Sequence, residues 1–261
     1  KQGAPPRQTR AVRPPTLFLA LRYVPPRYWR WIVAIPILVG LIAVWLLARS
    51  YEARAGPIAV TLAGLWTTPA TSFIYLYHEL WGMPFSVLSV LAIRYERTRA
   101  AVLAAVLATT IRELYALPLV VAALFLRRRE WIVGVLTVIG LYAVHVHFAA
   151  AVTSTRGHEP ALGTSHYTIR YLLNRISPAD RPAAWIFGLV TLVGAAIALA
   201  RLRVDVTARI SAVAYFSLAL LAVVAGRTYW SMTFGPLLSA YAALTIAQLV
   251  EQQRTRSSVR R

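Results

Sequence analysis

Two apolar runs joined by a single charged pair lie at the centre of the chain, and they constrain its fold most. The runs are Ala100–Ile111 and Leu114–Leu126, the pair is Arg112-Glu113, and arginine clusters flank both sides. One continuous helix would span about 40 Å at 1.5 Å per residue and place two charges near a bilayer midplane. Each such charge costs about 2.5–3.5 kcal/mol on insertion scales, and the two arginine clusters would fall on opposite sides of the membrane.

A hairpin of two short helices over residues 100–126 avoids both costs. Both arginine clusters then lie on the cytoplasmic face, as the positive-inside bias favours. The Arg112-Glu113 pair becomes the tip of the hairpin, near the outer face. Because each arm is only about 18–20 Å long, neighbouring protein must cover that tip. We therefore predict a short central hairpin.

The composition indicates a helical membrane protein. Hydrophobic residues make up 58% of the chain, and apolar runs of about 17–20 residues recur along it, which is the length of a membrane-spanning helix. The net charge of +19 is carried by arginines in the connections and tails, so it reports topology and argues against a nucleic-acid partner. The chain has no cysteine, which excludes disulfides, thiolate metal sites and cysteine nucleophiles. We predict an all-α polytopic transmembrane bundle of about nine membrane helices, the central hairpin included.

Charge and proline content divide the chain into three parts. Residues 1–30 are a basic arm on the outer face, whose Pro-Pro pairs favour extended backbone. Residues 31–250 form a single transmembrane helical domain with a polar outer loop at 153–182, and residues 251–261 form a basic cytoplasmic tail. Five arginine groups then share the cytoplasmic side. We expect a multi-pass protein of a bacterial cytoplasmic membrane with a cytoplasmic C-terminus.

Two helix limits near the first polar turn follow from prolines. We expect the second membrane helix to run from Pro57, which suits a first helical turn, to Tyr77. The short turn His78-Glu79 follows, and Pro84 opens the third helix. The last membrane helix is expected to end near Val250.

The charged residues of the outer side are the candidates for chemistry. Glu79 either stabilises a helix N-terminus or faces a cavity that binds a sugar, a metal or a cation. Arg112 either closes the hairpin tip in an ion pair with Glu113 or binds a lipid phosphate in the bidentate manner of guanidinium. The turn that holds Arg227 and Tyr229 either anchors the interface or contacts a lipid pyrophosphate or a sugar.

Other polar groups receive plainer interpretations. His145 and His147 are two residues apart, so on a helix they point in nearly opposite directions and cannot chelate one ion. No metal or cofactor is therefore expected. Acids of the cytoplasmic connections, Asp205 among them, lie beside arginines, where solvated ion pairs are expected.

The order of features between Ala55 and Arg129 is that of a known family. An outward helix ends in aromatics, the acid Glu79 opens the next helix, and a short helix ends in Thr-Thr-Ile-Arg-Glu before a return helix that an arginine run closes. This layout resembles the membrane-embedded GT-C glycosyltransferases that use polyprenyl-phosphate sugars, a group that includes protein O-mannosyltransferases and aminoarabinose transferases. The segment Thr110–Glu113 departs from the family pattern by one inserted residue.

The resemblance implies an enzyme that moves a sugar from a polyprenyl-phosphate donor to an acceptor on the outer face. We expect the substrate-binding residues to lie on the outer side and to include six positions: His78, Glu79, Arg112, Glu113, Arg227 and Tyr229. Of these, Glu79 matches the second acidic position of the family. The family's catalytic base is an outer-face acid in the loop after the first transmembrane helix. Residues 1–30 contain no acid, so that base is expected upstream of residue 1.

Two other classes remain open. A transporter or flippase for an anionic lipid or small molecule would use the same arginines, but it predicts matching discontinuous helices in both halves, and the sequence has one hairpin. A non-catalytic membrane subunit would explain the missing acid directly. Membrane lipids are expected partners in every case, and the oligomeric state stays open.

Overall fold

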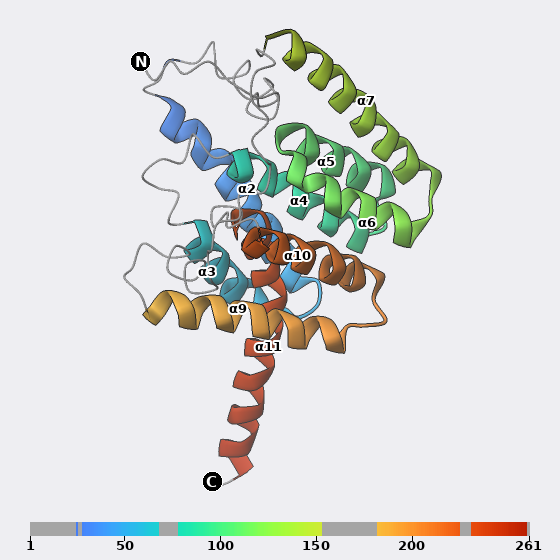
Figure 1. The fold of residues 1–261 in the computed structure, drawn as a ribbon. Coiled ribbons are helices and arrows are strands. Elements are labelled where there is room, and N and C mark those ends of the chain that lie inside the picture. Colours follow the sequence, from blue (N-terminus) through green and yellow to red (C-terminus); the bar gives the residue numbers. More distant parts are fainter. Residues whose placement is uncertain (1–24, 26–27, 68–77, 153–181, 225–230, 260–261) are drawn as a thin grey trace.

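Helices are the regular secondary structure of the described part of the chain. The computed structural model describes residues 25, 28–67, 78–152, 182–224 and 231–259, and all structural statements below concern these residues. They form nine α-helices, one short 3-10 helix and no strand. The elements, shown in Figure 1, are α2 (Trp29–Arg49), α3 (Ala55–Thr67), α4 (His78–Arg94), α5 (Thr98–Ile111), η5 (Glu113–Tyr115), α6 (Ala116–Leu126), α7 (Arg129–Val152), α9 (Pro182–Arg201), α10 (Val206–Val224) and α11 (Ser231–Val259).

Helix α11 forms the centre of the bundle, because it contacts α2, α3, α4, α9 and α10. Small side chains make much of this packing. Ala55, Ala59 and Ala63 recur every four residues along α3 and are fully buried. A Cβ added at Gly194 of α9 would lie 3.3 Å from the Cα of Ala242 in α11. Small residues on facing helices let the backbones approach closely, which is the packing typical of helices in membranes.

Helices α4 to α7 form the other side of the molecule. Helix α5 packs against α4 and α7, and α6 packs against α7 and α10. The Ser89 hydroxyl of α4 donates a hydrogen bond to the Ala101 carbonyl of α5 at 2.8 Å. Figure 1 shows α7 at the periphery of this group. The α5–α6 unit is therefore held between α4 and α10 on one side and α7 on the other.

The central segment doubles back, as the sequence predicts. Helix α5 ends at Ile111, η5 begins at Glu113, and α6 runs back to Leu126. Beyond that end, Arg128 Nη1 donates a hydrogen bond to Thr98 Oγ1 at 2.9 Å, so the two arginine-rich flanks meet. The hairpin is confirmed as a structural unit, and its placement in a membrane stays a prediction.

The arginine-bearing connections gather at one end of the bundle, which we call the arginine end. It comprises the α2–α3, α4–α5, α6–α7 and α9–α10 connections and the part of α11 beside them. Arg94 Nη1 lies 3.0 Å from Asp205 Oδ2, which joins the α4–α5 and α9–α10 connections. Arg54 pairs with Glu251, which joins the α2–α3 connection to α11. Figure 1 shows the α6–α7 and α9–α10 connections on the same side of the molecule.

Two helix limits differ from the sequence-based expectations, and a third lies where the described residues end. Pro84 does not open a helix: α4 begins at His78 and continues through the proline, which is buried against the Gly40 region of α2, so tertiary packing outweighs its local preference. Helix α3 ends at Thr67, and the expected end at Tyr77 lies outside the described residues. Helix α11 continues past residue 250 to Val259.

One described helix is long and apolar enough to cross a membrane on its own. It is the Thr233–Ser258 part of α11, whose most apolar window is 78% buried inside the bundle. Within other described helices, the apolar stretches are shorter, between 10 and 17 residues. The all-α class is therefore confirmed, whereas the number of membrane crossings stays a prediction.

Candidate functional site

The tip of the α5–α6 hairpin, which we call the apex, is built from residues 110–115. The hydroxyls of Thr109 and Thr110 donate to carbonyls one turn back in α5, at 2.8 Å in both cases, and such bonds offer the backbone an alternative to continued helix. Arg112 then adopts extended backbone, with φ −147° and ψ 118°. Its carbonyl accepts from the Tyr115 amide at 3.0 Å. The chain thus reverses within a few residues.

Arg112 is the one charged side chain that the described part of the bundle buries fully, with 2% of its surface exposed. It forms an ion pair with Glu113, the next residue, whose side chain is 44% exposed. A buried guanidinium costs several kcal/mol in desolvation, which its partner offsets only in good geometry. The structure therefore shows the Arg112–Glu113 ion pair, which is one of the two roles that the sequence analysis considered for Arg112.

The apex packs against the N-terminal part of α4. Tyr115 is buried, and a Cβ added at Gly82 would meet its ring at 2.3 Å, so the ring lies directly on the α4 backbone. The indole Nε1 of the neighbouring Trp81 is buried and has no hydrogen-bond acceptor among the described residues. His78 and Glu79 occupy the first turn of this helix. Two of the predicted binding positions therefore share the end of the bundle that holds Arg112.

The remaining predicted positions are not described. Arg227 and Tyr229 lie outside the described residues, as do nearly all of residues 1–30 and the outer loop at 153–181. Their proposed contacts stay predictions. Within the described ranges, no three His, Asp or Glu side chains lie close enough to hold a metal ion.

A polar network at the arginine end was missed by sequence reasoning. Asp205 accepts hydrogen bonds from Arg94 at 3.0 Å and from the Tyr51 hydroxyl at 3.2 Å. It also accepts from the Ala208 amide at 2.9 Å, which makes it the N-cap of α10. Its side chain is only 18% exposed, so the expected solvated pair with neighbouring arginines is wrong. An acid directly before a helical run was the available signal.

Aromatic contacts extend this network toward the centre of the bundle. The Arg94 guanidinium lies 4.3 Å from the centroid of the Tyr51 ring, and that ring lies 6.0 Å from the Tyr241 ring of α11. Burial raises the pKa of the Tyr51 hydroxyl above its ordinary value, and the adjacent Asp205 carboxylate raises it further. Tyr241 in turn shares a 2.9 Å hydrogen bond with Ser211 of α10. The network therefore links the α2–α3 and α9–α10 connections to the helices α4, α10 and α11.

Comparison with known proteins does not identify a family for this chain. No protein family, curated protein or solved structure matches the chain. The functional argument therefore rests on the residues and contacts described above.

Proposed function

We propose that this chain is a multi-pass membrane protein that transfers a sugar from a polyprenyl-phosphate donor, with the donor phosphate bound at the apex. The exposed surface supports the membrane part of the proposal. Large apolar side chains face outward along both α2 and α7. Those of α2 include Trp31, Ile35, Leu38, Val39 and Ile42, and those of α7 include Ile132, Val133, Leu136, Ile139, Tyr142 and Val144. Contiguous apolar surface of this extent is rare on soluble monomers and suits a lipid environment.

The charge distribution supports an orientation. Exposed arginines gather at the arginine end, and the apex lies at the other end of the hairpin arms. Under the positive-inside bias, the arginine end is cytoplasmic and the apex lies toward the outer face. The helix that carries Glu79 begins at the same end as the apex.

The observation that carries the enzymatic proposal is the fully buried Arg112 at the tip of a short hairpin. A buried cation within a membrane bundle marks a functional site by default. A guanidinium has five N–H donors in a fixed fork, a geometry that matches the oxygens of a phosphate. In the transfer, an acceptor hydroxyl gives its proton to a base and bonds to the sugar's anomeric carbon. The bond from that carbon to the phosphate oxygen breaks, and its electron pair stays on the phosphate. Arg112 would stabilise that charge in a site with little water.

Glu113 and Trp81 take supporting roles in this arrangement. Glu113 fixes the direction of the guanidinium, and its half-exposed carboxylate can move when a phosphate arrives. The unpaired indole donor of Trp81 suits a ligand rich in hydroxyl groups.

The test is sugar transfer from a synthetic polyprenyl-phosphate donor by the purified full-length protein, with whatever sequence precedes residue 1, in lipid nanodiscs. Arg112→Gln removes the charge and keeps a hydrogen-bonding side chain, and we expect kcat to fall about 100-fold. Arg112→Lys keeps the charge and should retain part of the rate. Arg254→Gln, on the exposed part of α11, is the matched control. A thermal melt of each variant separates lost chemistry from lost folding. Unchanged turnover in a folded Arg112→Gln protein contradicts the proposal.

A further inference from the structure

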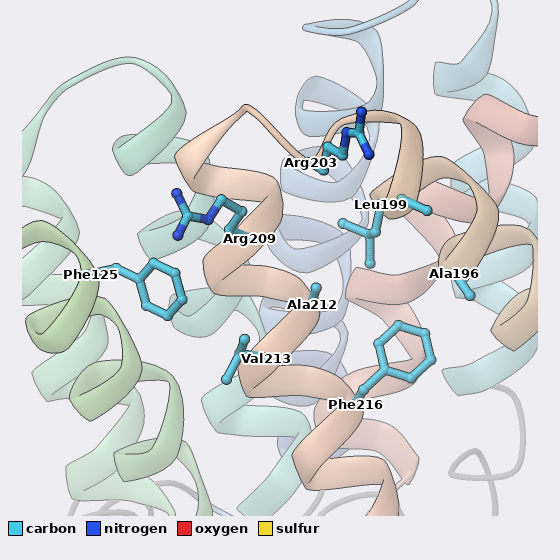
Figure 2. Close-up of a pocket in the computed structure, with 9 residues that line it drawn as sticks. Phe125, Ala196, Leu199, Arg203, Arg209, Ala212, Val213 and Phe216 are labelled. Carbon is cyan, nitrogen blue, oxygen red and sulfur yellow. The ribbon is translucent and has the colours of Figure 1, made fainter.

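A groove at the arginine end has the form of a lipid site. It opens between α6, α9 and α10 with a volume of about 380 Å³, within the range of small-ligand sites. Figure 2 shows Arg203 and Arg209 toward the α9–α10 connection and Phe216 farther along α10. The remaining lining is apolar: Phe125 from α6, Ala196, Leu199 and Ala200 from α9, and Ala212 and Val213 from α10.

Within the part of the chain that the structure describes, the two arginines of this groove have no counter-charge. Neither Arg203 nor Arg209 has a carboxylate partner among the described residues. The acid between them in the sequence, Asp205, is already engaged by Arg94 and Tyr51. Arg209 stacks on Phe125, with its Cζ 5.0 Å from the ring centroid, which fixes the guanidinium at the edge of the groove. The groove therefore presents net positive charge beside an apolar channel.

We propose that this groove binds an anionic phospholipid. The phosphate lies at the α9–α10 end of the groove, within reach of the long side chains of Arg203 and Arg209, whose guanidinium groups form charge-assisted hydrogen bonds. One acyl chain follows the apolar wall of α9 and α10 past Val213 to Phe216. Arg209 and Phe216 are seven residues apart on one helix, which is about 10 Å, so the chain runs along the bundle from the headgroup level into the hydrocarbon layer. Basic pockets between helices on the cytoplasmic side suit anionic headgroups.

A second groove, between α5 and α7, supplies an internal comparison. It has a volume of about 430 Å³, and Arg99 and Arg129 contribute to its lining, but so does Glu130. A carboxylate beside the two arginines repels a phosphate and lowers the net charge of the site. We therefore assign the lipid to the groove of Arg203 and Arg209.

The experiment measures the melting temperature of the full chain in a neutral detergent while one lipid is added. Phosphatidylglycerol should raise the melting temperature by about 3 °C or more, and phosphatidylcholine should raise it by less than about 1 °C. The readout needs no transfer activity, so its failure leaves the proposed enzymatic function standing, and the reverse also holds.

Four variants and one salt control locate the effect. Arg203→Ala with Arg209→Ala should lose most of the rise, whereas the charge-matched pair Arg254→Ala with Arg256→Ala and the pair Arg99→Ala with Arg129→Ala should keep it. Ala196→Phe fills the apolar channel without changing charge and should also lose the rise. Inorganic phosphate at the same concentration should have no effect.

Three results with the lipids and the variants would overturn the lipid assignment. They are equal rises with both lipids, equal losses in the groove pair and the Arg254 and Arg256 pair, and a full rise in the Ala196→Phe variant. A rise with inorganic phosphate alone would also overturn it, because the site would then bind free phosphate and not a lipid.

Discussion

The two ends of the bundle each hold an arginine–carboxylate pair, and the pairs are built in opposite ways. At the arginine end, Arg94 and Asp205 are 111 residues apart in the chain and join two connections, with 33% and 18% of their side chains exposed. At the apex, Arg112 and Glu113 are neighbours in sequence, and the arginine is 2% exposed. The Arg94–Asp205 pair links two parts of the fold that are distant in sequence, whereas the Arg112–Glu113 pair links two residues of one turn.

On the function proposed above, this difference separates a charge pair that stabilises the fold from one that binds the donor phosphate. Asp205 serves three donors at once, so its charge is matched by the fold. Arg112 is buried beside a partner that is itself half-exposed, an arrangement that adds little to the free energy of unfolding and costs desolvation. A cation kept at such a cost suits ligand binding better than stability.

The largest expected effect is at the arginine end. Asp205→Ala leaves Arg94 and the Tyr51 hydroxyl without an acceptor and removes the N-cap of α10. The free energy of unfolding should fall by about 2–3 kcal/mol, measured by chemical denaturation in detergent. Asp205→Asn retains an N-cap oxygen and should lose about half as much. Equal losses in both variants would show that the charge, and not the cap, dominates this end.

Packing at the apex gives the next effect. In Gly82→Ala, the new Cβ meets the Tyr115 ring at 2.3 Å, and the shift of that buried ring should cost about 1–2 kcal/mol of unfolding free energy. Gly64→Ala in α3 is the matched control, because a Cβ there meets nothing within 4 Å. That variant should gain about 0.5–1 kcal/mol, since alanine favours helix over glycine. Both changes are read from thermal melts, and a destabilised Gly64→Ala would contradict the packing described for α3.

The Tyr51 hydroxyl should make the free energy of unfolding depend on pH. Burial raises its pKa in the folded state, so its contribution is complete below the ordinary tyrosine pKa of about 10 and declines as the pH rises above that value. Tyr51→Phe should cost about 1 kcal/mol near pH 8 through the lost hydrogen bond to Asp205. The variant should lose less stability than the parent between about pH 9 and pH 11. If the free energies of unfolding of the Tyr51→Phe variant and the parent protein changed equally with pH, this role of Tyr51 would be ruled out.

The smallest effect is expected at the apex pair itself. Glu113→Gln keeps an oxygen that accepts from Arg112, and the side chain is half-exposed, so the free energy of unfolding should change by less than about 1 kcal/mol. A loss as large as that of Asp205→Ala, in the same denaturation assay, would make the apex pair structural and remove the distinction between the two ends.

The sequence predicted the hairpin better than the network that fixes it in place. The apolar runs on either side of Arg112-Glu113, with arginines beyond them, sufficed for the reversal because its determinants are local. The ion pair of Arg94 with Asp205 joins two residues that are 111 positions apart in the sequence. No local sequence pattern indicates such a contact. The start of α4 was predicted wrongly because Pro84 is an interior helix residue held by packing on α2. The sequence predicted that neighbouring protein covers the hairpin tip, because the two arms are short. It did not predict that the Arg112 side chain itself is buried.

The most direct test is the sidedness of single cysteines, which the cysteine-free chain accepts without background labelling. Arg97→Cys, Arg127→Cys and Val204→Cys occupy exposed positions of three connections at the arginine end, and Glu113→Cys marks the apex. In sealed membrane vesicles, an impermeant maleimide should modify the first three from one face only and should not reach Glu113→Cys from that face. Modification of Arg97→Cys and Arg127→Cys from opposite faces would contradict the account.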